Sequence, residues 1–108
     1  MPPTPSRFTG ATLRVLEALL DTAFEDPLYG LELMHRTRLS SGALYPVLMR
    51  LEQAGWVESS WQDVGPAVTG IRRRRGYRLT AAGVPAARHV LAGARRAHWV
   101  QAREIPST

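Results

Sequence analysis

The chain has 108 residues and a formal net charge of +5, contains no cysteine, and all 14 of its basic residues are arginine. The absence of cysteine excludes disulfides, thiolate metal sites and cysteine catalysis, and it fits a protein of the cytoplasm. The length predicts one domain with a small core, for which a partner subunit would be a useful support. The longest apolar run is far shorter than the roughly 18 residues that a membrane helix needs, so we expect no membrane partner.

The charge is distributed unevenly along the chain. Residues 1–63 contain 5 arginines against 8 acidic residues, whereas residues 64–108 contain 9 arginines against a single acid, Glu104. The two parts therefore have net charges of −3 and +8. Such asymmetry indicates a surface for a polyanion such as nucleic acid, although a solvated arginine-rich face without any partner also fits the composition.

The N-terminal part predicts an arm followed by two helices. Residues 1–8 are rich in proline and predict a disordered arm. Leucines at helical spacing in "TGATLRVLEALLDTAFEDP" predict a first helix that is capped by Thr9. The segment "LYGLELMHRT" predicts a short second helix whose buried side holds Leu31 and Met34, or alternatively Leu33.

The stretch "SSGALYPVLMRLEQAGWV" predicts a third helix with two different faces, capped by Ser40 or Ser41. The apolar face, which we expect in the core, contains Leu44, Val47, Leu48 and Leu51. The outer face contains Gly42, Tyr45, Pro46, Met49, Arg50 and Gln53. Pro46 removes one backbone N–H near the helix start, so we expect a loosened first turn rather than a break. This face can approach a phosphate backbone closely, but an ordinary solvated helix face is the alternative.

Two strand-like segments, "GWVESSWQ" and "RGYRLT", follow the third helix and predict a β-hairpin. They are joined by "DVGPAVTGIRRR", which we expect to be a long, basic, glycine-containing loop. Residues 72–75 and Arg78 are five arginines within seven positions, and they cannot all be buried. They either meet phosphates or remain a solvated charge run that protects a hairpin edge from aggregation.

The C-terminal part predicts a long helix over residues 81–104, with Thr80 as its cap and residues 105–108 as a tail. Because of Pro85, we expect regular helix only from Val84 or Pro85 onward. The spacing near 3.5 that indicates the seam of a helix pair is followed by Val84, Ala87, Leu91 and Ala94.

Three helices, a hairpin and a fourth helix predict an α+β, mainly α fold: a winged helix-turn-helix over residues 9–80 with a C-terminal helix that dimerises. In this arrangement the third helix enters a DNA major groove and the hairpin touches the flanking backbone.

The segments "LYGLEL", "SSGALYPVLMRLEQAGWVESSW" and "GYRLTAAG" together resemble the PadR family of bacterial transcriptional regulators. The resemblance runs from about Leu13 to Gly83. It implies a winged-helix homodimer that represses a promoter and is relieved by a small hydrophobic molecule or a stress signal. Two positions depart from the family pattern, Ala43 in place of threonine and Gly76 in place of an aromatic residue. The second departure leaves the register of the second hairpin strand open.

The resemblance and the outer face of the third helix together give a set of expected DNA contacts. They are Tyr29, Ser40, Ser41, Gly42, Tyr45, Arg50, Arg72, Arg73, Arg74 and Arg75. We expect double-stranded DNA with an inverted-repeat operator as the partner.

In short members of the family the C-terminal helix makes the dimer, which implies a homodimer seam formed by Ala87, Leu91, Ala94 and His98. Some short members bind flat hydrophobic compounds between the subunits through tryptophan. Trp99 occupies a comparable place, and plain core packing is its alternative role.

Catalysis and metal binding are not expected from the sequence. The three histidines, His35, His89 and His98, lack metal-ligand spacing, and no nucleophile elbow, phosphate loop or pair of carboxylates of motif quality is present. We therefore predict no enzyme and no cofactor. The predicted function is a sequence-specific, dimeric repressor. The alternative is a ligand-binding or protein-interaction module on the same fold that binds no operator.

Overall fold

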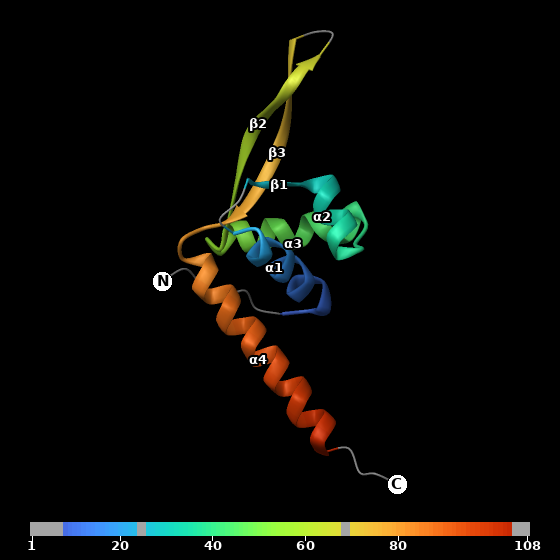
Figure 1. Ribbon diagram of the computed structural model, residues 1–108, viewed down its shortest axis with the longest axis vertical. Helices are drawn as coiled ribbons and strands as arrows, with labels where there is room; N and C mark the ends of the chain where they lie inside the picture. Colours follow the sequence, from blue (N-terminus) through green and yellow to red (C-terminus); the bar gives the residue numbers. More distant parts are fainter. Residues whose placement is uncertain (1–7, 24–25, 68–69, 105–108) are drawn as a thin grey trace.

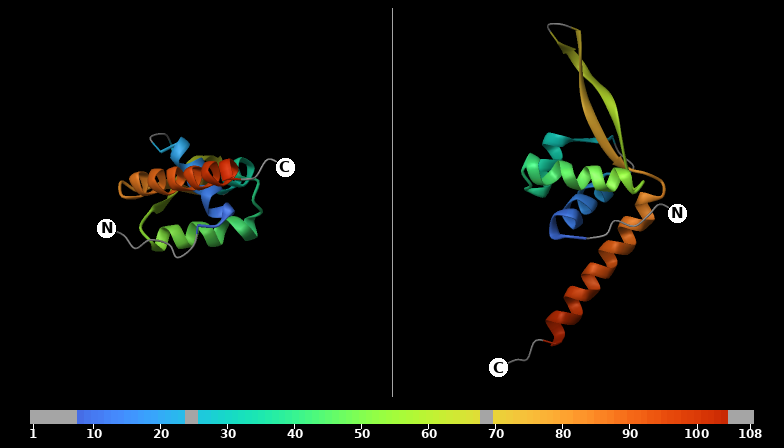
Figure 2. Two further views of the ribbon diagram at one scale, coloured as in Figure 1. Left: turned by 90° about the horizontal axis from the view of Figure 1, so that it is seen from below. Right: turned by 180° about the vertical axis from the view of Figure 1, so that it is seen from behind.

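The computed structural model describes residues 8–23, 26–67 and 70–104, and their side chains except those at positions 64, 66–72 and 97–104. A helical body lies at the centre, and a β-hairpin and the last helix project from it in opposite directions (Figure 1, Figure 2). The elements, in chain order, are α1 (Gly10–Asp21), β1 (Leu28–Tyr29), α2 (Gly30–Thr37), α3 (Ser41–Gln53), β2 (Val57–Ala67), β3 (Gly70–Leu79) and α4 (Gly83–Glu104).

Helices α1 and α2 follow from caps and apolar faces. The Thr9 side chain accepts a hydrogen bond from the Thr12 amide at 3.2 Å, which confirms the predicted cap of α1. In α2, Leu33 is fully buried whereas Leu31 is 65% exposed. The prediction that Leu31 faces the core is therefore wrong, and the alternative, Leu33, is right. The buried side of α2 is formed by Gly30, Leu33 and Thr37, which follow one another at helical spacing. Gly30 packs against Tyr45 of α3.

Helix α3 is continuous through Pro46, whose ring lies on the exposed face. The Ser40 hydroxyl accepts a hydrogen bond from the Ala43 amide at 3.3 Å and so fixes the start of the helix. The predicted core face is confirmed, since Leu44, Val47, Leu48 and Leu51 are all buried. Gly55, at φ +80°, ends the helix in the left-handed region that favours glycine.

The sheet has the strand order β1-β3-β2 and is antiparallel throughout. Strand β1 was not expected from the sequence. The segment predicted as a long loop is mostly strand, because the ladder of β2 and β3 continues outward as far as Ala67 opposite Gly70. A bulge between Asp63 and Gly65 accommodates the glycine at φ +120°. Within this ladder Pro66 lies opposite Ile71.

Gly76 fixes the register of β3, which the sequence left open. It lies opposite Ser60 of β2 and Tyr29 of β1. A Cβ atom at this position would stand 2.8 Å from Pro27 Cβ and 3.1 Å from Gln62 Cγ. The glycine is present because the chain before β1 packs directly over the strand.

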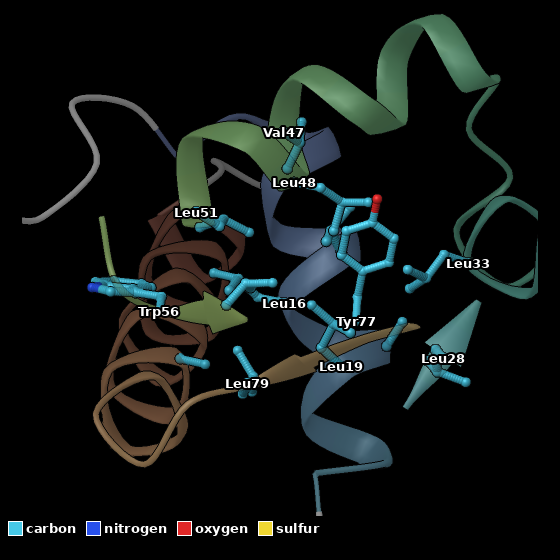
Figure 3. Close-up of a cluster of buried hydrophobic side chains, with 14 of the residues drawn as sticks. Leu16, Leu19, Leu28, Leu33, Val47, Leu48, Leu51, Trp56, Tyr77 and Leu79 are labelled. Atoms are coloured by element: carbon cyan, nitrogen blue, oxygen red, sulfur yellow. The ribbon is translucent and has the colours of Figure 1, made fainter. Parts of the chain in front are cut away.

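One apolar core joins all the helices to the base of the hairpin (Figure 3). Trp56 lies in it as predicted, 3% exposed, and Phe8 stacks on the Trp56 indole with ring centroids 5.7 Å apart. Phe8 is thus packed rather than part of a disordered arm. The rest of that predicted arm, residues 1–7, lies outside the described residues, as does the predicted tail.

Helix α4 begins at Gly83, inside the predicted range of 81–104 and one residue before Val84, the earlier of the two positions at which we expected regular helix. The Thr80 hydroxyl accepts from the Gly83 amide at 2.9 Å and donates to the Gly55 carbonyl at 2.6 Å, which ties the helix start to the end of α3. Ala87 and Leu91 are 0% and 5% exposed within a single chain, because α4 packs on α1 there. The expectation that these two form a seam between subunits is corrected: they are core residues of the single chain. Within the described ranges, no helix is long and apolar enough to cross a membrane.

Candidate nucleic-acid interface

The first turn of α3 presents small polar residues to solvent. Ser40, Ser41 and Gly42 are all exposed. The Ser40 hydroxyl is engaged in capping the helix. A Cβ atom on Gly42 would have only the Ser40 hydroxyl as a neighbour, at 4.0 Å, so nothing inside the protein requires glycine there. The missing side chain instead leaves the helix backbone open to close approach from outside.

The place of Tyr45 on the outer face of α3 suggested a freely projecting side chain, but the structure differs. Tyr45 is 42% exposed, and its ring lies against Gly30 at the start of α2. A Cβ atom on Gly30 would overlap the Tyr45 hydroxyl and lie 3.1 Å from Cζ. The N-cap residue of α2, Tyr29, makes no side-chain capping bond. The Tyr45 hydroxyl therefore lies beside a helix end with positive dipole character.

Tyr45 and the start of α2 line one hollow together with the base of the hairpin. The walls of the hollow come from β1, α2, α3 and β3, and they are formed by Tyr29, Gly30, Leu31, Tyr45, Arg74 and Arg75. Four of these residues were predicted as DNA contacts from the sequence. The Arg74 guanidinium, two phenols and a helix N-terminus form a set of hydrogen-bond donors that suits a phosphate group. Leu31 was missed as a lining residue because the sequence placed it in the core.

The predicted arginines of the hairpin divide between its two faces. Arg73 lies opposite Asp63 and forms an exposed ion pair with it at 3.3 Å. Arg75 lies opposite Trp61, with its guanidinium carbon 5.6 Å from the indole centre. Arg74 points to the other face, because side chains alternate along a strand. The side chain of Arg72 lies outside the described ones.

Arg50, the remaining predicted contact, is exposed in the last turn of α3 and does not line the hollow. Eight residues separate it from Gly42, which corresponds to about 12 Å along the helix. The backbone at Arg50 is therefore well separated from the first turn of α3. Among the residues that the structure describes, no cluster of three or more His, Asp or Glu side chains could hold a metal ion.

Tyr77 lies among the buried side chains of the core and is 7% exposed (Figure 3). Burial raises the pKa of its phenol above the ordinary value of 10, the neighbouring Tyr45 and Glu52 raise it further, and the Arg75 guanidinium opposes them. The fold therefore favours the neutral phenol.

This pKa shift predicts an alkaline loss of stability. Because the folded-state pKa is raised, the stabilising contribution of Tyr77 is complete below pH 10 and is lost as the pH rises through the folded value. Urea unfolding between pH 9 and pH 11 should show a steeper decline for the wild type than for Tyr77→Phe. The chain has neither lysine nor cysteine, so few other side chains titrate in this range. Equal declines for the two proteins would contradict the prediction.

Residues 19–89 match the model of the Transcriptional regulator PadR-like family. The match covers more than half of the chain and includes every residue that lines the hollow. The chain belongs to this family. PadR-like proteins are DNA-binding transcriptional regulators rather than enzymes, which agrees with the donor-rich hollow and with the resemblance seen in the sequence.

Solved structures show the same fold. A PadR-like transcription factor from Bacteroides fragilis superposes with a TM-score of 0.62 at 19% identity, covering 87% of this chain and 90% of that one. A candidate DNA-binding protein from Ralstonia eutropha gives 0.61 at 24% identity, over 78% and 98% of the two chains. The PcaV regulator of Streptomyces coelicolor, solved with its natural ligand, gives 0.65 at 23% identity, over 95% and 65%. Among curated protein sequences none matches this PadR-like chain.

Proposed function

We propose that this PadR-like protein is a dimeric, sequence-specific repressor that binds an inverted-repeat operator. The observation that supports this most strongly is the hollow, where Tyr29, Tyr45 and Arg74 come together at the N-terminus of α2. A DNA phosphate held there would place the exposed first turn of α3, with Ser41 and Gly42, at the edge of the major groove. Ser40, Arg50 and the arginines at 72–75 would meet further parts of the DNA.

The dimer, in this proposal, is made by the part of α4 beyond Leu91. This part projects away from the helical body (Figure 2) and begins with the small residues Ala92, Gly93 and Ala94. Small residues allow two helices to approach closely. His98 would extend the same contact, and its side chain lies outside the described ones. Two α3 helices held in this way would read half-sites about one DNA turn apart.

Relief of repression would come from a small hydrophobic molecule or another signal that changes the angle between the subunits. The PcaV structure contains that protein's natural ligand, so a structurally similar regulator does bind a ligand. Trp99 is our candidate ligand contact, and its side chain also lies outside the described ones. The protein would act in the cytoplasm, where bacterial DNA lies.

The alternative is an interaction module that uses the winged helix without an operator. The hollow argues against it, because a set of cationic and hydroxyl donors around a helix N-terminus has no evident use in an apolar protein contact. A protein that binds a hydrophobic dye but no selected DNA would support this alternative.

Replacing Tyr45 with alanine tests the proposed function. We expect the affinity for DNA selected by this protein from a random pool to fall at least about tenfold, since a hydrogen bond to a charged group is lost. Tyr45→Phe, which keeps the ring against Gly30, should lose most of the same affinity. Size-exclusion chromatography should show an unchanged dimer. Wild-type affinity in Tyr45→Ala would remove Tyr45 and the hollow from the DNA interface.

Gly42→Ala should separate stability from binding. The added methyl group has open space around it, so the free energy of unfolding should rise by about 0.5–1 kcal/mol. The same methyl group should weaken DNA binding, because it stands between the helix backbone and an approaching phosphate. Thermal unfolding and DNA titration of one preparation measure both effects. If the alanine variant is more stable and binds DNA as the wild type does, α3 does not approach the DNA backbone at Gly42.

A further inference from the structure

The hairpin leaves the body of the protein at a defined point. Strand β3 is paired on both sides only at Gly76 and Tyr77, where β1 joins the sheet. From Trp61 and Arg75 outward the hairpin has two strands, and we call this part the wing (Figure 1). A two-stranded hairpin is only marginally stable in water by itself. Side chains at the base of the wing must therefore fix its direction relative to α3.

Three polar side chains connect α3 to both strands at this base. The Ser59 hydroxyl of β2 donates to Glu52 Oε2 of α3 at 2.5 Å. The Ser59 hydroxyl oxygen itself accepts a hydrogen bond from Arg75 Nε of β3 at 3.0 Å. The Arg75 guanidinium in turn lies near the face of Trp61, its cross-strand neighbour. Helix α3, strand β2 and strand β3 are thus linked through the Ser59 hydroxyl, which bonds to the Glu52 carboxylate on one side and to the Arg75 guanidinium on the other.

We infer that Glu52, Ser59, Arg75 and Trp61 form a brace that sets the angle between the wing and α3. In this role Glu52 and Ser59 are positioning residues for DNA binding, although neither has a positive charge to offer a phosphate. The inference rests on the proposed function, because the angle matters when α3 and the wing must meet one DNA duplex together. Groups that are held in place before binding lose less entropy when the complex forms.

Removing the Glu52 carboxylate tests the brace, because the brace and simple electrostatics predict opposite changes in DNA affinity. Removing a negative charge beside DNA should by itself tighten binding. If Glu52 holds the wing, Glu52→Ala should instead weaken binding to the selected DNA on the order of tenfold, the equivalent of one hydrogen bond to a charged group. The matched control is Glu58→Ala, an exposed acid on the other face of β2. Binding by Glu52→Ala as tight as that by Glu58→Ala would overturn the inference.

Ser59 and Ser60 provide a second matched pair, because they are adjacent and point to opposite faces of β2. Ser59→Ala should weaken DNA binding without changing the dependence of log K on log salt, since no charge is removed. Ser60→Ala should bind as the wild type does. Ser59→Thr keeps the hydroxyl and should restore the affinity. Equal affinities for Ser59→Ala and Ser60→Ala would overturn the proposed brace.

A measurement on the free protein keeps the brace distinct from the proposed function. Nitrogen-15 relaxation of the Trp61 indole N–H and of the wing amides reports how firmly the wing is held. The order parameters should fall in Ser59→Ala and stay at wild-type values in Ser60→Ala. Unchanged order parameters in Ser59→Ala would overturn the brace itself. If the order parameters fall in Ser59→Ala but the wild-type protein binds no specific DNA, the brace is supported and the proposed function is contradicted.

Discussion

Replacing Gly83 with alanine should lower the free energy of unfolding by about 3 kcal/mol, as expected for overpacking in a tight site. A Cβ atom there would overlap the Trp56 carbonyl oxygen and stand 2.8 Å from the carbonyl carbon. These are backbone atoms, and the Trp56 carbonyl oxygen accepts a hydrogen bond from the Thr80 amide, so neither backbone segment can move aside at low cost. The start of α4 would separate from the end of α3.

Thermal unfolding followed by circular dichroism measures this effect, and the midpoint should fall by at least about 10 °C. The matched control is Gly10→Ala in the first turn of α1, away from the proposed dimer contact. A Cβ atom on Gly10 would meet nothing within 4 Å, so this substitution should raise stability slightly through its higher helix propensity. Equal midpoints for the two variants would contradict the close packing of α4 against Trp56.

The second large effect concerns the wing. The double substitution Arg73→Gln and Arg74→Gln should lower the slope of log K against log salt by about 1.8, because each phosphate contact contributes about 0.9. At 0.1 M salt the same two contacts correspond to a loss of affinity of about 60-fold. Arg75 is left in place, because its removal would also release the proposed brace.

A control with the same change in charge separates contact from overall attraction. Arg88 and Arg95 are exposed on α4, which projects away from the wing (Figure 1). Replacing both with glutamine should leave the slope close to that of the wild type. Identical slopes for the two double variants would mean that the wing arginines do not meet phosphates and only add to the net charge.

Sequence periodicity predicted the elements whose signals are local. The core face of α3 and the caps Thr9 and Ser40 depend on residues within one or two helical turns. The length of the hairpin and the existence of β1 depend on pairing between distant segments, so they were missed. The spacing of Ala87 and Leu91 indicates a helix face that packs on another helix, whether that helix belongs to the same chain or to a second subunit. The sequence therefore could not show that α1 covers them.

The candidate site was predictable by residue but not by shape. A motif and a run of charge pointed to Tyr29, Tyr45 and Arg74. Their assembly depends on β1 pairing with β3, which brings the wing arginines to the N-terminus of α2. The brace was equally hidden, since Glu52, Ser59 and Arg75 come from three different elements of a chain that offers many other polar residues.

The most direct test of the account is a titration of the purified protein against its selected DNA, at two salt concentrations, with and without excess unrelated DNA. We expect binding that resists the competitor, since specific sites are typically bound at least about 10³-fold more tightly than non-specific ones. We also expect a steep dependence on salt. Binding that disappears in the presence of the competitor would contradict a sequence-specific repressor.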